Sequence, residues 1–173
     1  TARDHGFIPE TLVYQAGAAA GGVARGLVKT ALEAGSEVLE VSEGVLAKLA
    51  SKDNPQALLG VFRQRFASAP DLQKLTAADT WLALEEIRDP GNLGTIIRTA
   101  DAVGLSGIIL VGTTCDPYAL ESIRATMGSI FAVPIVKLDR ESFFSLAKAW
   151  PGEVIGTHLD AREDFRQTEY KGR

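Results

Sequence analysis

The residues with the clearest capacity for chemistry lie in the stretch LALEEIRDPGNLGTIIRTADAVGLSGIILV, from Leu82 to Val111. Asn92 follows a turn rich in Asp, Pro and Gly, and Arg98 comes shortly after it, in the early turns of an expected helix. The N-terminal end of a helix is positive, so a cation there gains nothing from the helix dipole. We therefore expect Arg98 to meet a negative group, held by turn amides together with the guanidinium fork.

The turn before Arg98 leaves the chemistry open. It lacks the G-x-G-x-x-G spacing of dinucleotide sites and the G-x-x-x-x-G-K spacing of P-loops. The G-x-x-G run from Gly91 to Gly94 is similar to the loop of KH domains, but one short match carries little weight. The alternative interpretation is a plain strand-to-helix turn with Asn92 as N-cap, and a surface Arg98 paired with Asp101 or Glu86.

Alternating strands and helices must position these residues. In the first part we expect strands at residues 10–15, 37–41 and 58–62, a helix that ends before Gly35, and a second helix capped by Ser42. After a small, polar connection over residues 67–79, we expect strands at 81–87, 107–111, 131–136 and 153–157. The helices between them are expected at 93–103, from Asp116–Pro117 to Gly128, and at 141–150. This order favours βα units, a parallel sheet and ligands beyond the carboxyl ends of the strands.

Composition narrows the class of protein. The chain has 173 residues, of which 46% are hydrophobic and 23% charged, as is usual for globular domains. No apolar run is long enough to span a membrane, and the single Cys115 leaves no internal disulfide and suits a reducing, cytoplasmic setting. A net charge of −4 and a pI near 5.2 argue against binding of nucleic acid by bulk charge, but leave room for a local basic patch.

Two segments carry a resemblance to a known family. DPGNLGTIIRTADAVG resembles the first signature motif of the SpoU (TrmH-type) RNA ribose 2′-O-methyltransferases of the SPOUT superfamily, and RATMGSIFAVPIV resembles the second. GTHLDAREDF is similar to the segment that usually follows. The two motifs occur in order at the expected interval, so the resemblance is specific and extends over most of the chain.

The resemblance implies an α/β fold in two parts. Residues 1–66 resemble the small ribosomal-protein-like α/β domain that binds RNA substrate in many members, and we expect this domain to be incomplete at its start, without its opening helix. Residues 80–173 resemble an open parallel-sheet SPOUT domain, which is Rossmann-like and of the trefoil-knot type. The family's third motif, which completes the methyl-donor site and threads the knot, does not follow before Arg173. We therefore expect a chain truncated before the knot, and a native protein that continues past Arg173.

The resemblance also implies an activity. Family members transfer a methyl group from S-adenosylmethionine to a ribose 2′-hydroxyl of RNA, and an N-terminal domain of this type favours rRNA over tRNA. Arg98 and Asn92 are then the catalytic candidates, and Arg98 and Arg124 are the candidates for RNA contact. Because a guanidinium has a pKa above about 12, we interpret Arg98 as a phosphate clamp and alkoxide stabiliser rather than a base.

Further candidate residues concern the cofactor site and the assembly of the protein. The resemblance places Gly128 near the cofactor, and Thr157, His158 and Leu159 are cofactor candidates because they follow the last expected strand, where backbone groups can meet adenosine. No metal is implied, and a homodimer is expected. Gly128 could instead only cap a helix, Arg124 could be a solvated surface residue, and His158 a loop residue. Two other classes stay open: a non-catalytic RNA-binding module, and a Rossmann-like enzyme that binds a small nucleotide.

Overall fold

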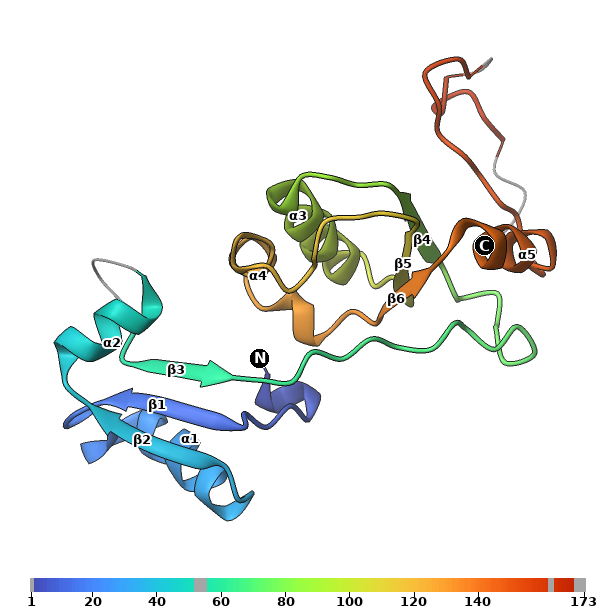
Figure 1. The fold of residues 1–173 in the computed structure, drawn as a ribbon. Helices are drawn as coiled ribbons and strands as arrows, with labels where there is room; N and C mark the ends of the chain where they lie inside the picture. Colours follow the sequence, from blue (N-terminus) through green and yellow to red (C-terminus); the bar gives the residue numbers. More distant parts are fainter. Residues whose placement is uncertain (1, 52–55, 162–163, 170–173) are drawn as a thin grey trace. The chain divides into compact units, whose positions relative to one another are not determined.

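The computed structural model describes residues 2–51, 56–161 and 164–169 and divides the chain into two compact units, Thr1–Gln64 and Arg65–Arg173 (Figure 1). None of the helices among these residues combines the length and apolar character needed to cross a membrane.

The first unit is a three-stranded sheet with two helices. Its elements are η1 (Arg3–His5), β1 (Thr11–Gln15), η2 (Ala18–Ala20), α1 (Gly22–Glu33), β2 (Glu37–Val41), α2 (Glu43–Ala50) and β3 (Leu58–Val61). The strand order is β2-β1-β3, and β1 is parallel to β2 but antiparallel to β3. The expectation of a wholly parallel sheet is therefore wrong for this unit, because β3 returns along the other edge of β1.

One helix end in this unit matches its sequence signal. Gly35 adopts a left-handed φ of 80°, and the amide of Ser36 donates to the carbonyl of Ala31 at 3.0 Å. Such a residue lets the chain leave a helix while its last carbonyls stay hydrogen-bonded. This is the stop that the glycine predicts.

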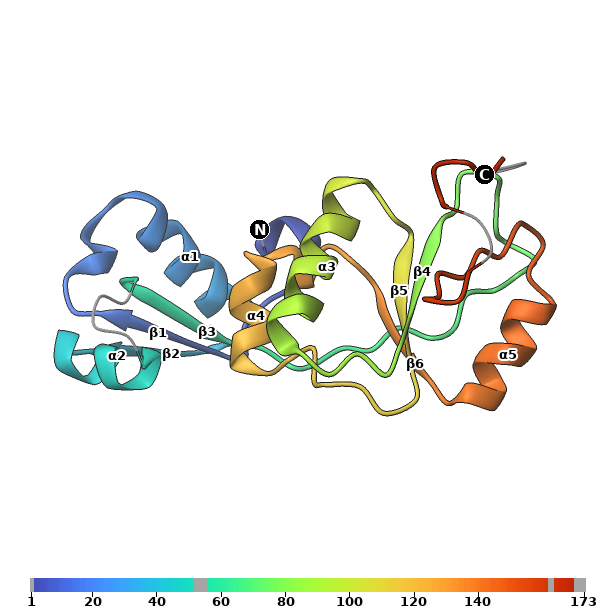
Figure 2. The ribbon, with the colours of Figure 1, turned by 90° about the horizontal axis from the view of Figure 1, so that it is seen from above.

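The second unit is a parallel α/β layer. It contains β4 (Trp81–Glu85), α3 (Pro90–Ala102), β5 (Gly107–Val111), α4 (Leu120–Thr126), η3 (Ser129–Phe131), β6 (Ile135–Leu138) and α5 (Arg140–Lys148). The strand order is β4-β5-β6, with both pairs parallel, as the sequence predicts. Figure 2 shows α3 and α4 side by side on one face of the sheet and α5 on the other.

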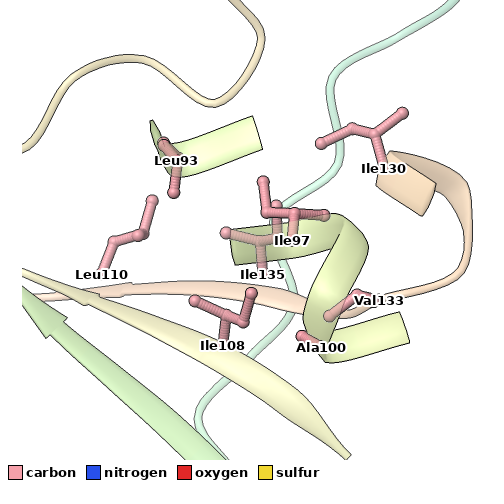
Figure 3. Close-up of a cluster of buried hydrophobic side chains, with 8 residues drawn as sticks. All are labelled: Leu93, Ile97, Ala100, Ile108, Leu110, Ile130, Val133 and Ile135. Atoms are coloured by element: carbon pink, nitrogen blue, oxygen red, sulfur yellow. The ribbon is translucent and has the colours of Figure 1, made fainter. Parts of the chain in front are cut away.

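β5 is buried on both faces, which explains its unbroken apolar sequence. Ile108 and Leu110 belong to the cluster that includes Leu93, Ile97 and Ala100 of α3, with Ile130, Val133 and Ile135 beyond (Figure 3). The alternate residues Ile109 and Val111 pack with side chains of α5. The sheet therefore fixes α3 through side chains that are removed from water, the main source of its stability.

The connection between the predicted domains begins against the second unit. The amide of Ala67 donates to the carbonyl of Ile135 at 2.8 Å, and the amide of Arg65 donates to the hydroxyl of Tyr118 at 3.1 Å. The ring of Phe66 packs edge-on against Tyr118, with 5.3 Å between centroids. Residues 65–67 are thus part of the second unit.

Candidate functional site

The first turn of α3 starts earlier than the sequence pattern predicts. The helix begins at Pro90, and its N-cap is Asp89, whose Oδ1 accepts from the amide of Asn92 at 2.5 Å. Asn92 is therefore not the N-cap; it is the third helical residue, and its side chain is exposed. Proline suits the first helical position, because its fixed φ and missing N–H cost nothing there, so the helix starts earlier than the apolar pattern alone indicates.

This earlier start changes the setting of Arg98. With α3 spanning Pro90–Ala102, Arg98 lies in the third turn rather than at the positive end. The dipole penalty that the sequence analysis assigns to it is wrong, since such effects fade beyond the first turn. Arg98 is exposed and forms no ion pair with any residue that the structure describes.

The carboxylate of Glu86 pairs with two other arginines and not with Arg98. Glu86 pairs with Arg88 and Arg140, at 3.4 Å and 3.1 Å respectively. The alternative of an Arg98–Glu86 surface pair is therefore also wrong, and the guanidinium of Arg98 is available to a ligand.

Asn92 and Arg98 do not share a face of α3. At about 100° per residue, six positions place their side chains about 120° apart around the helix axis. Gly91, by contrast, lies within about 20° of Arg98 on the same face. The helix therefore does not bring Asn92 against Arg98, and a joint action of the two would have to pass through a ligand.

A shallow groove borders the Arg98 face. It is lined by Gly91, Leu120, Glu121, Arg124 and Ala125, and so lies between the start of α3 and α4. The helices can approach closely because of Gly94: a Cβ added there would lie 2.4 Å from the carbonyl oxygen of Ser122. Arg98 is about 40° from Gly94 around α3, so the groove lies along the side of the helix that carries Arg98.

Two residues of this arrangement escape the sequence analysis. Gly94 is one, although a glycine inside a helical pattern is a signal for close packing. Glu121 is the other: a Cβ built at Gly91 would lie 3.6 Å from its Oε1 and 3.3 Å from Asp89 Oδ1. Two carboxylates thus face the first turn of α3. The turn amides are therefore a poor place for a phosphate, contrary to the expectation of an anion site made by them.

Arg124 lines this groove, and Gly128 lies just beyond the C-terminal end of α4. α4 begins at Leu120 and ends at Thr126, so its predicted start at Asp116–Pro117 is wrong; the Asp116 carboxylate instead accepts from the amide of Tyr118 at 3.0 Å. Met127 and Gly128 are both left-handed, with φ of 53° and 104°. Gly128 is thus a turn residue after the helix, which agrees with its structural interpretation.

The candidate cofactor segment lies apart from these helices. Residues 153–157 form no strand, so the expected last strand is wrong: its apolar residues have no hydrogen-bonded neighbour in the described chain, and Val154 and Ile155 are 59% and 53% exposed. Thr157, His158 and Leu159 follow it and are all exposed. The segment after α5, coloured orange to red, lies on the α5 side of the sheet in both views (Figures 1 and 2). The structure does not bring these three residues to Arg98.

Other titratable groups offer little for catalysis. Burial raises the pKa of the Cys115 thiol, which leaves it protonated and unreactive at neutral pH. Burial likewise raises the pKa of Tyr118, whose hydroxyl serves the connection described above. The Nδ1 atom of His158 accepts from the amide of Asp160 at 3.1 Å. Within the described parts of the chain, no three His, Cys, Asp or Glu side chains cluster as a metal site.

Comparison with known proteins identifies the family. The model of the SpoU rRNA methylase family matches residues 79–173, which is more than half of the chain. The chain belongs to the SpoU rRNA methylase family. The model of the MRM3-like substrate binding domain matches residues 1–60.

Individual members agree with this assignment. The chain is 34% identical over 136 residues to the 23S rRNA (guanosine(2553)-2′-O)-methyltransferase RlmP of Bacillus subtilis, covering 79% of this chain and 52% of that protein. It is 31% identical to the 23S rRNA (uridine(2479)-2′-O)-methyltransferase of Streptomyces viridochromogenes, covering 88% and 48%. The chain thus spans about half the length of these curated relatives.

Solved structures of the family share the fold. The AdoMet-bound rRNA methyltransferase from Sinorhizobium meliloti superimposes with a TM-score of 0.87 at 43% identity, covering 99% of this chain and 63% of that one. The SpoU methyltransferase AviRb from Streptomyces viridochromogenes gives a TM-score of 0.68 at 27% identity, covering 86% and 53%. The predicted α/β architecture of the SpoU family is confirmed.

Proposed function

We propose that the protein containing this chain transfers a methyl group from S-adenosylmethionine to a ribose 2′-hydroxyl of rRNA. The observation that carries the proposal is Arg98: a guanidinium exposed on α3 beside the α3–α4 groove, without an ion pair among the described residues. Membership of the SpoU rRNA methylase family and the names of the relatives support the reaction.

Arg98 acts as an electrostatic stabiliser. The 2′-hydroxyl must lose its proton to solvent as its oxygen attacks, and the negative charge that develops on this oxygen is stabilised by the guanidinium. Arginine stays protonated in proteins, so Arg98 does not accept the proton. The exposed side chain can also form a forked contact with the adjacent phosphate.

Asn92 and Arg124 have supporting roles. Asn92 lies on a different face of α3 from Arg98, and its exposed amide binds the ribose rather than the arginine. Arg124 lines the groove and contacts RNA phosphate there. The neighbouring Glu121 repels phosphate from the first turn of α3, so the backbone of the RNA lies toward Arg98 and Arg124.

The segment that includes Thr157, His158 and Leu159 holds S-adenosylmethionine. The cofactor supplies the methyl group from its sulfonium. The residues suit an adenosyl group: Leu159 is wholly exposed, and the backbone groups of residues 154–157 form no hydrogen bonds within the described chain. Apolar side chains together with a few backbone donors and acceptors are the groups that line nucleotide and cofactor sites.

The first unit binds the rRNA substrate, and the protein acts as a cytoplasmic homodimer. The match of residues 1–60 to a substrate-binding domain supports the first part. The dimer is supported by exposed apolar side chains on α4 and at its C-terminal cap, where Leu120, Ile123 and Met127 are 56%, 38% and 74% exposed. Light scattering of the full-length protein tests assembly: a monomer across micromolar concentrations contradicts the dimer without touching the reaction.

The reaction is tested with the full-length protein, rRNA fragments and S-adenosylmethionine labelled in its methyl group. Label should enter RNA, and the modified nucleotide should resist alkaline cleavage, because the 2′-oxygen can no longer attack the neighbouring phosphate. Label on a base would refute ribose methylation. Tight binding of RNA without transfer would favour the non-catalytic module.

A further inference from the structure

One guanidinium joins two successive carboxylates at the carboxyl edge of the sheet. Arg140 is the first residue of α5, and its Nε lies 2.9 Å from Oε1 of Glu85. Its Nη2 donates to Oε1 of Glu86 at 3.1 Å. We infer that Arg140 is a positioning residue, which holds the turn at Glu86 and thereby orients the first turn of α3.

The backbone at Glu86 explains how both contacts form. Glu85 ends β4, and successive side chains of a strand point to opposite faces, so one guanidinium would not normally meet both. Glu86 has a φ of 49°, a left-handed conformation that is unfavourable for a residue with a Cβ. This twist brings its carboxylate to the same side as that of Glu85. The double ion pair and the strained residue are thus parts of one arrangement.

The contacts of Glu86 and Arg140 connect the carboxyl ends of β4, β5 and β6. The amide of Glu86 donates to the carbonyl of Val111, the last residue of β5, at 3.1 Å. Gly112, which follows, lies close enough that an added Cβ would be 3.7 Å from Cγ of Glu86 and 4.0 Å from Cγ of Arg140. Arg140 comes shortly after the end of β6, directly after Asp139, which is the N-cap of α5. The guanidinium therefore closes the turn after β4 onto the ends of the other two strands.

The turn leads directly to the candidate site. The carbonyl of Ile87 accepts from the amide of Cys115 at 2.8 Å, and Asp89 then caps α3 through the amide of Asn92. A change in the backbone conformation at Glu86 should therefore also move Asn92, which lies only a few residues further along the chain. Exposed ion pairs contribute little to global stability one by one, and Arg140 is 58% exposed. Loss of Arg140 should therefore loosen this turn without unfolding the unit.

The local part of the inference is tested by hydrogen exchange on the full-length protein, with Arg140→Gln compared with Lys74→Gln. Lys74 pairs with Asp71 at 3.2 Å on the surface of the same unit and serves as the control for loss of an ion pair. Arg140→Gln should speed exchange of the hydrogen-bonded amides of Glu86 and Asn92 about tenfold and leave the melting temperature nearly unchanged; the control should change neither. Unaltered exchange would overturn the inference, and so would unfolding of the whole unit.

The functional part rests on the proposed methyl transfer. Arg140→Gln should lower kcat about tenfold to a hundredfold through misplacement of catalytic groups, while KM for RNA changes less than about twofold. Arg140→Lys should recover part of both kcat and exchange protection, since an ammonium keeps the charge but not the fork. A changed KM with unchanged kcat would assign Arg140 to RNA binding instead. Exchange is measured without turnover, so it stands or falls independently of the reaction.

Discussion

The two sides of the candidate site differ in what holds them. Arg98 stands on α3, whose Leu93 and Ile97 are 0% exposed and packed against β5 and β6. Leu159, on the proposed cofactor side, is 102% exposed and follows a segment without strand pairing. The Arg98 side is thus shaped by the core before any ligand arrives, whereas the described residues give the other side no such support. Electrostatic catalysis depends on this kind of preorganisation, so the charge stabiliser of the proposed reaction belongs on the first side.

The largest expected effect is loss of the guanidinium at Arg98. Arg98→Ala should lower the single-turnover rate of the full-length enzyme about a hundredfold to a thousandfold, as removal of a charge stabiliser usually does. Arg98→Lys should recover only part, because an ammonium lacks the fork. Since Arg98 is exposed in mid-helix, stability should change by less than about 0.5 kcal/mol. Near-normal turnover would make Arg98 an ordinary surface residue; Lys148→Ala, at the exposed end of α5, is the control.

A larger residue at Gly94 should disrupt the packing of α3 against α4. A methyl group at this position would lie 2.4 Å from the Ser122 carbonyl oxygen and 2.6 Å from the Ala125 Cβ, so the helices must separate. Gly94→Ala should lower the free energy of unfolding by about 2 kcal/mol, despite the better helix propensity of alanine. Gly26→Ala is the matched control: it lies inside α1 with nothing within 4 Å of its added Cβ, and should stabilise by about 0.5–1 kcal/mol. Equal results from denaturant unfolding would mean that the helix contact is looser than described.

The parallel sheet of the second unit could be predicted because its signal is local. GIILV is apolar at every position, and the structure buries all of it on both faces. The first turn of α3 was harder, because Asn92 and Asp89 are both good caps and the apolar pattern begins only at Leu93. Pro90 could have decided between them, since proline favours the first helical position.

Other features depend on contacts between distant residues. The antiparallel pairing of β3 and the missing strand at 153–157 follow from which edge finds a partner, and apolar alternation does not encode that choice. The Arg140 contacts likewise join residues far apart in sequence through an unusual backbone at Glu86. The motif positions Arg98 and Asn92 were visible from the sequence, but their separation around α3 required the true start of the helix.

The cofactor side can be tested with Leu159→Ala. A fully exposed side chain contributes almost nothing to folding, so the melting temperature should not move. If adenosine covers this side chain, its loss should weaken binding of S-adenosylmethionine by about tenfold, in line with the apolar area removed from water. Calorimetric titration of the full-length protein measures this, with Val103→Ala as the control, since Val103 is a 66% exposed apolar residue at the end of α3. Unchanged affinity would remove Leu159 from the cofactor site.

The smallest expected effect lies at the opposite edge of the sheet, before β4. The carboxylate of Asp79 accepts from the amide and the hydroxyl of Thr76, each at 2.8 Å, and from the hydroxyl of Ser106 at 2.9 Å. These hydrogen bonds, that of the Thr76 amide above all, lower the pKa of Asp79 below its ordinary value of 3.8. A lowered folded-state pKa stabilises the protein above pH 3.8, and this contribution is lost as the pH falls through the lower value.

Asp79→Asn should therefore reduce the melting temperature slightly at pH 7, and the difference from the wild type should shrink as the pH falls below about 4. Asp101→Asn, on the exposed side of α3, controls for loss of a negative charge. Because Asp79 lies at the amino ends of the strands, methyl transfer at pH 7 should be unchanged. A melting difference that stayed constant between pH 7 and pH 3 would show that the asparagine acts through lost packing rather than through the carboxylate. A loss of methyl transfer would mean that the two edges of the sheet are coupled.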